Sequence, residues 1–226
     1  MDIEKVTNNT KARESRESRA IKAFLDLYSS TDSALDEISK IAVSNTTKDT
    51  LLKSHVINTV TAVEVYYRDK LDSVFRLCKP TSFVGKLKKL HDRSYKIDDL
   101  LDMYVHRIHP LELVANNLNF QNIVSIEKTF TILLGKSFFK KTKNLKWRIK
   151  DMSDSETEIS QDDIDAMQYV FEERHQLIHN PISNYSIDTE VIEKKLGSVL
   201  KVIMASELVI SDFINDNIDP EIASNK

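Results

Sequence analysis

Apolar residues recur along most of this chain with the three-to-four-residue period of an amphipathic α-helix. Five stretches show the period strongly: about 49–77, 98–107, 121–134, 162–180 and 189–218. The two longest have room for about eight helical turns each, which is typical of a helical bundle. The pattern therefore predicts an all-α fold.

Helix-terminating residues set the limits of several of these elements. Gly135 follows the apolar stretch 121–134 and is predicted as its C-cap. The sequence Ser160-Gln161-Asp162-Asp163 is typical of a capping box. The helix after it should end at Asn180, because the residue before a proline leaves the α region.

The ends of the chain are less regular. Residues 1–17 are polar without an apolar period, so we expect a flexible arm. Two short amphipathic helices are predicted next, around 21–28 and 34–42, the second opened by Thr31-Asp32-Ser33. Residues 18–218 then make a single α-helical domain, and 219–226 a flexible tail.

Composition narrows the class of protein further. The chain has 226 residues, is 41% hydrophobic and carries a net charge of −3, so any nucleic-acid site has to be a local patch. Three isolated glycines exclude a glycine-rich phosphate loop. Cys78, the sole cysteine, leaves no partner for an intrachain disulfide and is predicted as a core residue. A polar N-terminus and no spanning apolar run predict a soluble cytoplasmic protein without a membrane segment.

The helix predicted over 162–180 carries the chain's most concentrated candidate chemistry. Arg174 lies in the apolar stripe three residues after Phe171, where a guanidinium is costly unless it is paired or faces a ligand cavity. His175 and His179 lie one turn apart on the flank of that stripe. Arginine can hold a phosphate, and histidine can move protons near neutral pH. Together they suit RNA cleavage by the RNA's own 2′-hydroxyl.

Two other interpretations use the same residues. Arg174 could be structural, paired with Glu64 from the helix over 49–77, with His179 a polar helix end. His175 and His179 could form a metal pair, but Gln176 stands where an H-E-x-x-H helix has its glutamate, so no metal and no cofactor are predicted.

A basic segment precedes the helix predicted over 162–180. Residues 136–150 hold seven basic residues and no acid, with Phe138, Phe139 and Trp147 between them. Such a segment can follow a phosphate backbone, or it can be an amphipathic element with its aromatics inward and its lysines in water. The candidate RNA contacts are Asn180, Lys140, Lys141, Lys143, Lys146 and Arg148.

The hexamer Arg174-His175-Gln176-Leu177-Ile178-His179 resembles the R-x4-6-H motif of the HEPN superfamily of α-helical domains. Two further segments are similar to family helices in the same order: Leu51–Asp69, which carries Glu64, and Phe120–Gly135. The resemblance covers about residues 50–215. It implies a HEPN-like bundle with additional N-terminal helices and a basic insertion before the motif helix.

The resemblance also implies a function. Many HEPN proteins are metal-independent endoribonucleases of toxin or antiviral-defence systems, and their sites form at a homodimer interface. In that reading Arg174 and His179 are catalytic, His175 supports the site, and Glu64 orients Arg174 or a histidine. The alternatives are a non-catalytic HEPN module that binds RNA or a partner protein, and an α-helical scaffold.

One branch of the family fits less well. There an antitoxin modifies a tyrosine two residues after the motif histidine. Pro181 occupies that position here and the nearest following tyrosine is Tyr185, so this chain departs from that pattern.

Overall fold

The computed structural model describes residues 4, 6–8, 20–40, 44–90, 95–106, 108–148, 156–180 and 187–223, and it confirms the all-α prediction. The elements in chain order are α2 (Ala20–Ser39), α3 (Asn45–Leu77), the 3-10 turn η1 (Pro80–Ser82), α4 (Val84–Leu90), α5 (Ile97–Val105), α6 (Pro110–Asn117), α7 (Ile123–Leu134), α8 (Phe138–Lys143), α9 (Gln161–His179), α10 (Thr189–Asn217) and α11 (Pro220–Ala223).

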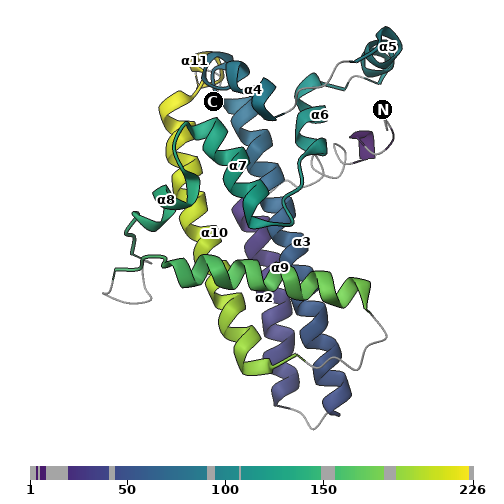
Figure 1. The fold of residues 1–226 in the computed structure, drawn as a ribbon, viewed down its shortest axis with the longest axis vertical. Helices are drawn as coiled ribbons and strands as arrows, with labels where there is room; N and C mark the ends of the chain where they lie inside the picture. The colour runs from purple at the N-terminus through teal and green to yellow at the C-terminus, as the bar shows by residue number, and fades with distance from the viewer. Residues whose placement is uncertain are drawn as a thin grey trace.

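The long helices α3 and α10 form the centre of the bundle. Helix α2 packs along α3, and α9 lies across them (Figure 1). Their inward faces supply much of the main core, including Val63 and Tyr67 of α3 and Ile203 of α10, all fully buried. Met167 and Val170 of α9 pack into the same core. This packing fixes the direction of α9 relative to α3.

Buried polar side chains join α3 to α10. The hydroxyl groups of Tyr67 and Ser206 lie 2.8 Å apart, and Lys70 Nζ donates to Glu207 Oε1 over 2.6 Å. Because buried polar groups are costly unless they are hydrogen-bonded, these contacts favour one register between the two helices.

The N-terminal helices correct one prediction. Residues 20–39 form the single helix α2, where two short helices had been expected. Thr31, expected to open the second helix, lies inside α2 and its hydroxyl donates to the Leu27 carbonyl over 2.7 Å. Ser30 makes the same kind of bond to Leu27 over 3.0 Å. Serine and threonine inside a helix can form this bond to the carbonyl of the preceding turn, so polar residues here do not mark a helix end.

Several helix ends match the prediction. Gly135 takes the left-handed conformation (φ 71°) at the end of α7, and Ser160 with Asp163 forms the capping box of α9. Cys78 is buried, as expected of a core residue. Ends marked by glycine, serine and aspartate are therefore where the sequence was most informative.

The aromatic residues of the basic segment face inward. Phe138 and Phe139 on α8 are buried in the main core, and Trp147 packs against it. Glu127 of α7 holds the start of α8, because its Oε2 accepts from the Phe139 N–H over 2.7 Å. Residues 149–155 lie outside the described residues.

The predicted arm and tail fall partly outside what the structure describes. Within 1–17, residues 4 and 6–8 are described as helical, and Val6 is buried beside Met103 and Ile108 in a second, smaller core cluster. In the tail, residues 220–223 form the helical turn α11, and 224–226 lie outside the described residues.

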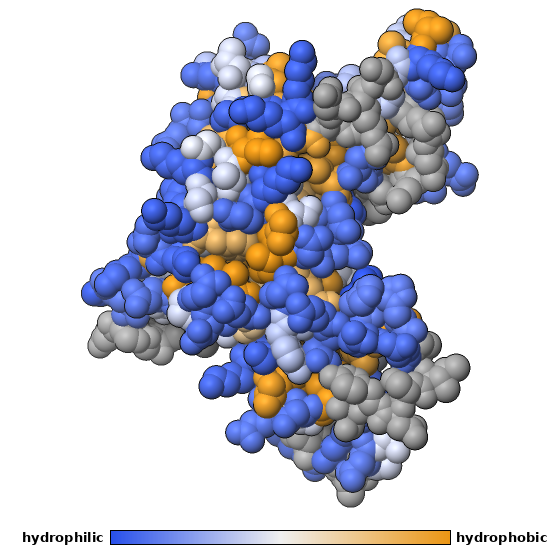
Figure 2. All heavy atoms as spheres, viewed as in Figure 1, coloured by the Kyte–Doolittle hydropathy of each residue, from blue (hydrophilic) through white to orange (hydrophobic). Residues whose placement is uncertain are grey.

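Helix α5 projects from the body of the molecule (Figure 1). Only Met103 is buried among its residues, and its other apolar side chains contribute to the hydrophobic patch at the upper right of Figure 2. None of the described helices combines the length and apolarity needed to cross a membrane.

Candidate functional site

The motif helix α9 carries Arg174 at the border between its buried and exposed faces. Val170 and Phe171 are buried one turn earlier, and Glu173 is buried beside them, whereas Arg174 is only partly buried. A long arginine side chain can cover apolar surface with its stem while its charged end reaches a polar cavity. The packing of α9 on the core therefore brings the Arg174 guanidinium to the edge of a pocket.

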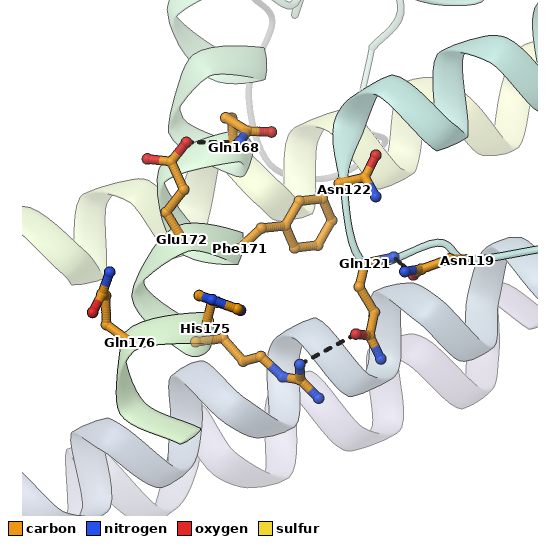
Figure 3. A pocket seen from close by; sticks show the side chains of 9 residues that line it. Asn119, Gln121, Asn122, Gln168, Phe171, Glu172, His175 and Gln176 are labelled. Carbon is orange, nitrogen blue, oxygen red and sulfur yellow. Dashed lines mark hydrogen bonds between the residues drawn. The ribbon is translucent and has the colours of Figure 1, made fainter. Parts of the chain in front are cut away.

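That pocket has a volume of about 310 Å³ and lies between α9 and the segment before α7 (Figure 3). We call it the motif pocket. It is lined by Asn119, Gln121, Asn122, Gln168, Phe171, Glu172, Arg174, His175 and Gln176.

A chain of hydrogen bonds links Arg174 to Glu64 through Gln121. Arg174 Nη1 donates to Gln121 Oε1 over 3.2 Å (Figure 3), and Gln121 Nε2 donates to Glu64 Oε2 over 2.6 Å. Glu64 also forms an ion pair with Arg68, with Nη2 2.7 Å from Oε1. The expected contact between Glu64 and Arg174 is thus indirect, because the carboxylate pairs with the arginine one turn along its own helix.

This arrangement leaves the charge of Arg174 without a direct counterion. Within the part of the chain that the structure describes, no carboxylate lies within 4.0 Å of the Arg174 guanidinium, whose Nε is buried without a hydrogen-bond partner. A guanidinium in this position can offer its remaining N–H groups to an anion in the motif pocket.

The two motif histidines lie next to each other at the exposed end of α9. Their ring centroids are 4.2 Å apart with the ring planes tilted by 52°. His175 lines the motif pocket, whereas His179 stands one turn further on and is not among the lining residues. Asn180 caps the helix, and its Nδ2 donates to Gln176 Oε1 over 3.0 Å.

The basic segment lies near the opposite end of α9. Lys143 donates to Gln161 Oε1 over 2.8 Å at the first residue of α9. Arg174 lies thirteen positions after Gln161, which is about 20 Å along a helix. The predicted lysine contacts and the motif residues therefore do not form one site within a single chain.

The cations of this segment have different surroundings. Lys140 and Lys141 line a separate pocket of about 440 Å³ together with Lys136, Ser137 and Asn144. The exposed Lys146 and Arg148 lie 3.5–4.0 Å from the carboxylates of Glu156 and Glu158. Acidic residues that follow the basic segment in sequence thus face part of it in space.

Sequence reasoning missed the polar residues that complete the motif pocket. Gln121 and Asn122 belong to the segment that is similar to a family helix, but no role was predicted for them, nor for Asn119 and Gln168. No spacing along the chain marks these residues, because they belong to different elements that meet only when α9 packs on the bundle. No group of three or more metal-ligating side chains is found among the described residues.

No family model, curated protein or solved structure matches this chain. The resemblance to HEPN proteins therefore rests on the motifs in the sequence.

Proposed function

We propose that this protein is a HEPN-type, metal-independent endoribonuclease of a toxin or antiviral-defence system. The observation that carries the proposal is the Arg174 guanidinium at the motif pocket, anchored through Gln121 and with no carboxylate of the described residues within 4.0 Å. His175 lines the same pocket, and the exposed ring of His179 lies against that of His175 one turn further along α9. A fixed cation and an imidazole in one pocket, with a second imidazole adjoining the first, suit a phosphodiester flanked by groups that exchange protons.

The proposed reaction is a transesterification within the RNA. His179 takes the proton from a 2′-hydroxyl, and the 2′-oxygen forms a bond to the adjacent phosphorus. The bond from phosphorus to the 5′-oxygen then breaks, and that oxygen receives a proton from a second imidazole. Arg174 neutralises the charge that grows on the phosphate oxygens. The products are a 2′,3′-cyclic phosphate and a 5′-hydroxyl.

One observation favours a second candidate. His179 is outside the lining of the motif pocket in the single chain, and an RNA held by Arg174 alone would be bound without being cut. The second candidate is therefore a non-catalytic HEPN module that binds RNA.

The test is to incubate purified protein with mixed-sequence RNA in EDTA and to identify the chemical form of any new ends. We expect the new ends to carry 2′,3′-cyclic phosphates. A substrate with 2′-deoxy sugars should not be cleaved, because it lacks the attacking hydroxyl group. Cleavage should weaken at high salt, because phosphate contacts release counterions. Arg174→Ala and His179→Ala should each reduce the rate about 10²–10⁴-fold.

Matched controls are Arg76→Ala and His106→Ala, since both side chains are exposed and distant in sequence from the motif. These variants should keep wild-type rates. Cleavage of a 2′-deoxy substrate, or a fully active His179→Ala variant, would reject the mechanism. RNA binding without cleavage would favour the second candidate.

A further inference from the structure

The motif pocket is lined mainly by side-chain amides. Five of its nine lining residues are asparagine or glutamine: Asn119, Gln121, Asn122, Gln168 and Gln176. A site that needed only to hold a phosphate would be served by cations, whereas amides are suited to the mixed donor and acceptor edges of a nucleobase. The hydrogen bonds that these amides already make within the protein show which of their donor and acceptor groups remain for a ligand.

The wall before α7 presents donors. Asn119 Oδ1 accepts from the Gln121 N–H over 2.8 Å, and Asn122 Oδ1 accepts from the Ser125 N–H over 2.7 Å at the start of α7. Both side-chain oxygens are thus engaged by backbone N–H groups, which assigns the orientation of the amides. Among the described residues their Nδ2 groups make no hydrogen bond, so each lining asparagine keeps a free donor.

On the α9 wall, Gln168 and Glu172 present acceptors, whereas Arg174 presents donors and Gln176, whose Oε1 accepts from Asn180 Nδ2 over 3.0 Å, is left with its Nε2 donor. Gln168 Nε2 donates to Glu172 Oε1 over 2.7 Å. This bond steadies the exposed Glu172 carboxylate and leaves Gln168 Oε1 as an acceptor. The apolar ring of Phe171 lies between the two walls (Figure 3). A flat ligand between the two walls would therefore meet the asparagine donors on one edge and the Glu172 carboxylate on the other.

Guanine matches this arrangement best among the four RNA bases. Its O6 and N7 are adjacent acceptors, and its N1–H and N2–H₂ are adjacent donors that can share one carboxylate. Adenine and cytosine place a ring-nitrogen acceptor next to their amino group, which would face Glu172 unfavourably. Uracil has one N–H between two carbonyl oxygens.

We propose that the motif pocket is a guanine-binding subsite, with Glu172 as the residue that selects the base. The proposal rests on the proposed function in one respect: the phosphate attached to this guanosine is the one held by Arg174. The pocket would then give the nuclease a preference for RNA at guanosines.

The test measures binding of the four ribonucleoside 3′-monophosphates to the full-length protein by calorimetry. Guanosine 3′-monophosphate should bind at least about tenfold more tightly than the others, because a bidentate base contact discriminates by roughly that factor or more. Inosine 3′-monophosphate, which lacks the N2 amino group, should lose much of this advantage.

Two variants assign the preference to its residues. Glu172→Gln should bind all four nucleotides with similar affinity, whereas Glu190→Gln, an exposed glutamate on α10, should keep the guanosine preference. Glu172 is exposed, so its replacement should preserve the fold, which circular dichroism checks. Equal binding of the four nucleotides by the wild type, preference for another base, or a preference that survives Glu172→Gln would overturn the proposal.

The nucleotide assay and the cleavage assay fail independently. RNA cleavage with equal binding of all four nucleotides would reject the guanine subsite and leave the nuclease proposal standing. Selective guanosine binding without any RNA cleavage would reject the nuclease proposal and support the subsite.

Discussion

Arg174 can act on a ligand only if its guanidinium is held in place without being neutralised. A directly paired carboxylate would fix the arginine but would also cancel much of its charge in a partly buried site. Gln121 avoids this by standing between Arg174 and Glu64. The Gln121 amide is held by the Glu64 carboxylate and in turn holds the Arg174 guanidinium, so the two charged groups stay apart.

Replacing Gln121 tests this role. Gln121→Leu removes both hydrogen bonds of the chain and leaves the partly buried ends of Glu64 and Arg174 without this partner. We expect the free energy of unfolding to fall by about 1–3 kcal/mol, as for other orphaned buried groups. Under the proposed function, RNA cleavage at saturating RNA should also fall.

The measurements are urea unfolding and the cleavage rate at saturating RNA. Gln161→Leu is the matched control, since this exposed glutamine begins α9 beside the basic segment, at the end far from Arg174. It should change the unfolding free energy by no more than about 0.5 kcal/mol. If Gln121→Leu lowered stability but left cleavage at the wild-type rate, the amide would be only structural.

The sequence foresaw some of these residue-level relations. The helical period placed Arg174 in an apolar stripe and Glu64 at the edge of another, so a polar link between them could be expected. The helical period could not reveal Gln121, because it describes one helix at a time. It does not show which third segment of the chain contacts both Arg174 and Glu64.

At the scale of elements, residues that cap helices were the most predictable feature. Ser160 and Asp163 form a reciprocal capping box at the start of α9, with Ser160 N donating to Asp163 Oδ2 over 2.9 Å and Asp163 N to Ser160 Oγ over 3.2 Å. Such bonds are local in sequence and can be predicted without the fold. The joining of two expected helices into α2 was missed because polar residues alone do not show whether their hydroxyl groups bond back to the helix.

The capping box gives α9 a pH-dependent stability. Burial alone would raise the pKa of Asp163, but hydrogen bonds from Ser160 and Ser198, with Lys201 nearby, outweigh it and hold the pKa below the ordinary value of an aspartate. A carboxylate with a lowered pKa in the folded state stabilises the fold above its unfolded pKa, and this contribution disappears as the pH falls through the folded value.

Asp163→Asn should therefore reduce the free energy of unfolding by about 1 kcal/mol at neutral pH, as typical for a lost capping charge. The difference from wild type should shrink once the pH falls below about 4. Urea unfolding of both proteins across this range measures it, with Asp212→Asn, an exposed acid on α10, as control. A difference that stays constant down to the lowest pH at which the protein folds would contradict this origin.

At the scale of the whole molecule, charge is distributed rather than concentrated. The net charge is −3, and Glu156 and Glu158 lie close to the cations of the basic segment. The sequence showed both the basic and the acidic stretch, but not that the chain would fold one against the other. The lining of the motif pocket holds one cation, Arg174, and one carboxylate, Glu172, so a longer RNA would need further cationic contacts.

A second copy of the chain is the most direct source of such contacts. In one chain Arg174 and His175 line the motif pocket, while His179 stands outside it with its ring exposed. The neighbouring Ile178 is 41% exposed at the same end of α9. Two copies related by a twofold axis at this end would bury that apolar side chain and bring two sets of motif residues to one groove.

We therefore predict a homodimer whose interface includes the C-terminal turn of α9. Light scattering at micromolar concentration should give about twice the chain mass of 26.0 kDa. Ile178→Asp should shift the protein toward the monomer, because it places a charge in the apolar contact, and should reduce RNA cleavage in parallel. Val124→Asp, at a more exposed valine on α7, is the control and should leave both unchanged. A wild-type protein that is monomeric at this concentration and still cuts RNA would show that one chain forms the complete site.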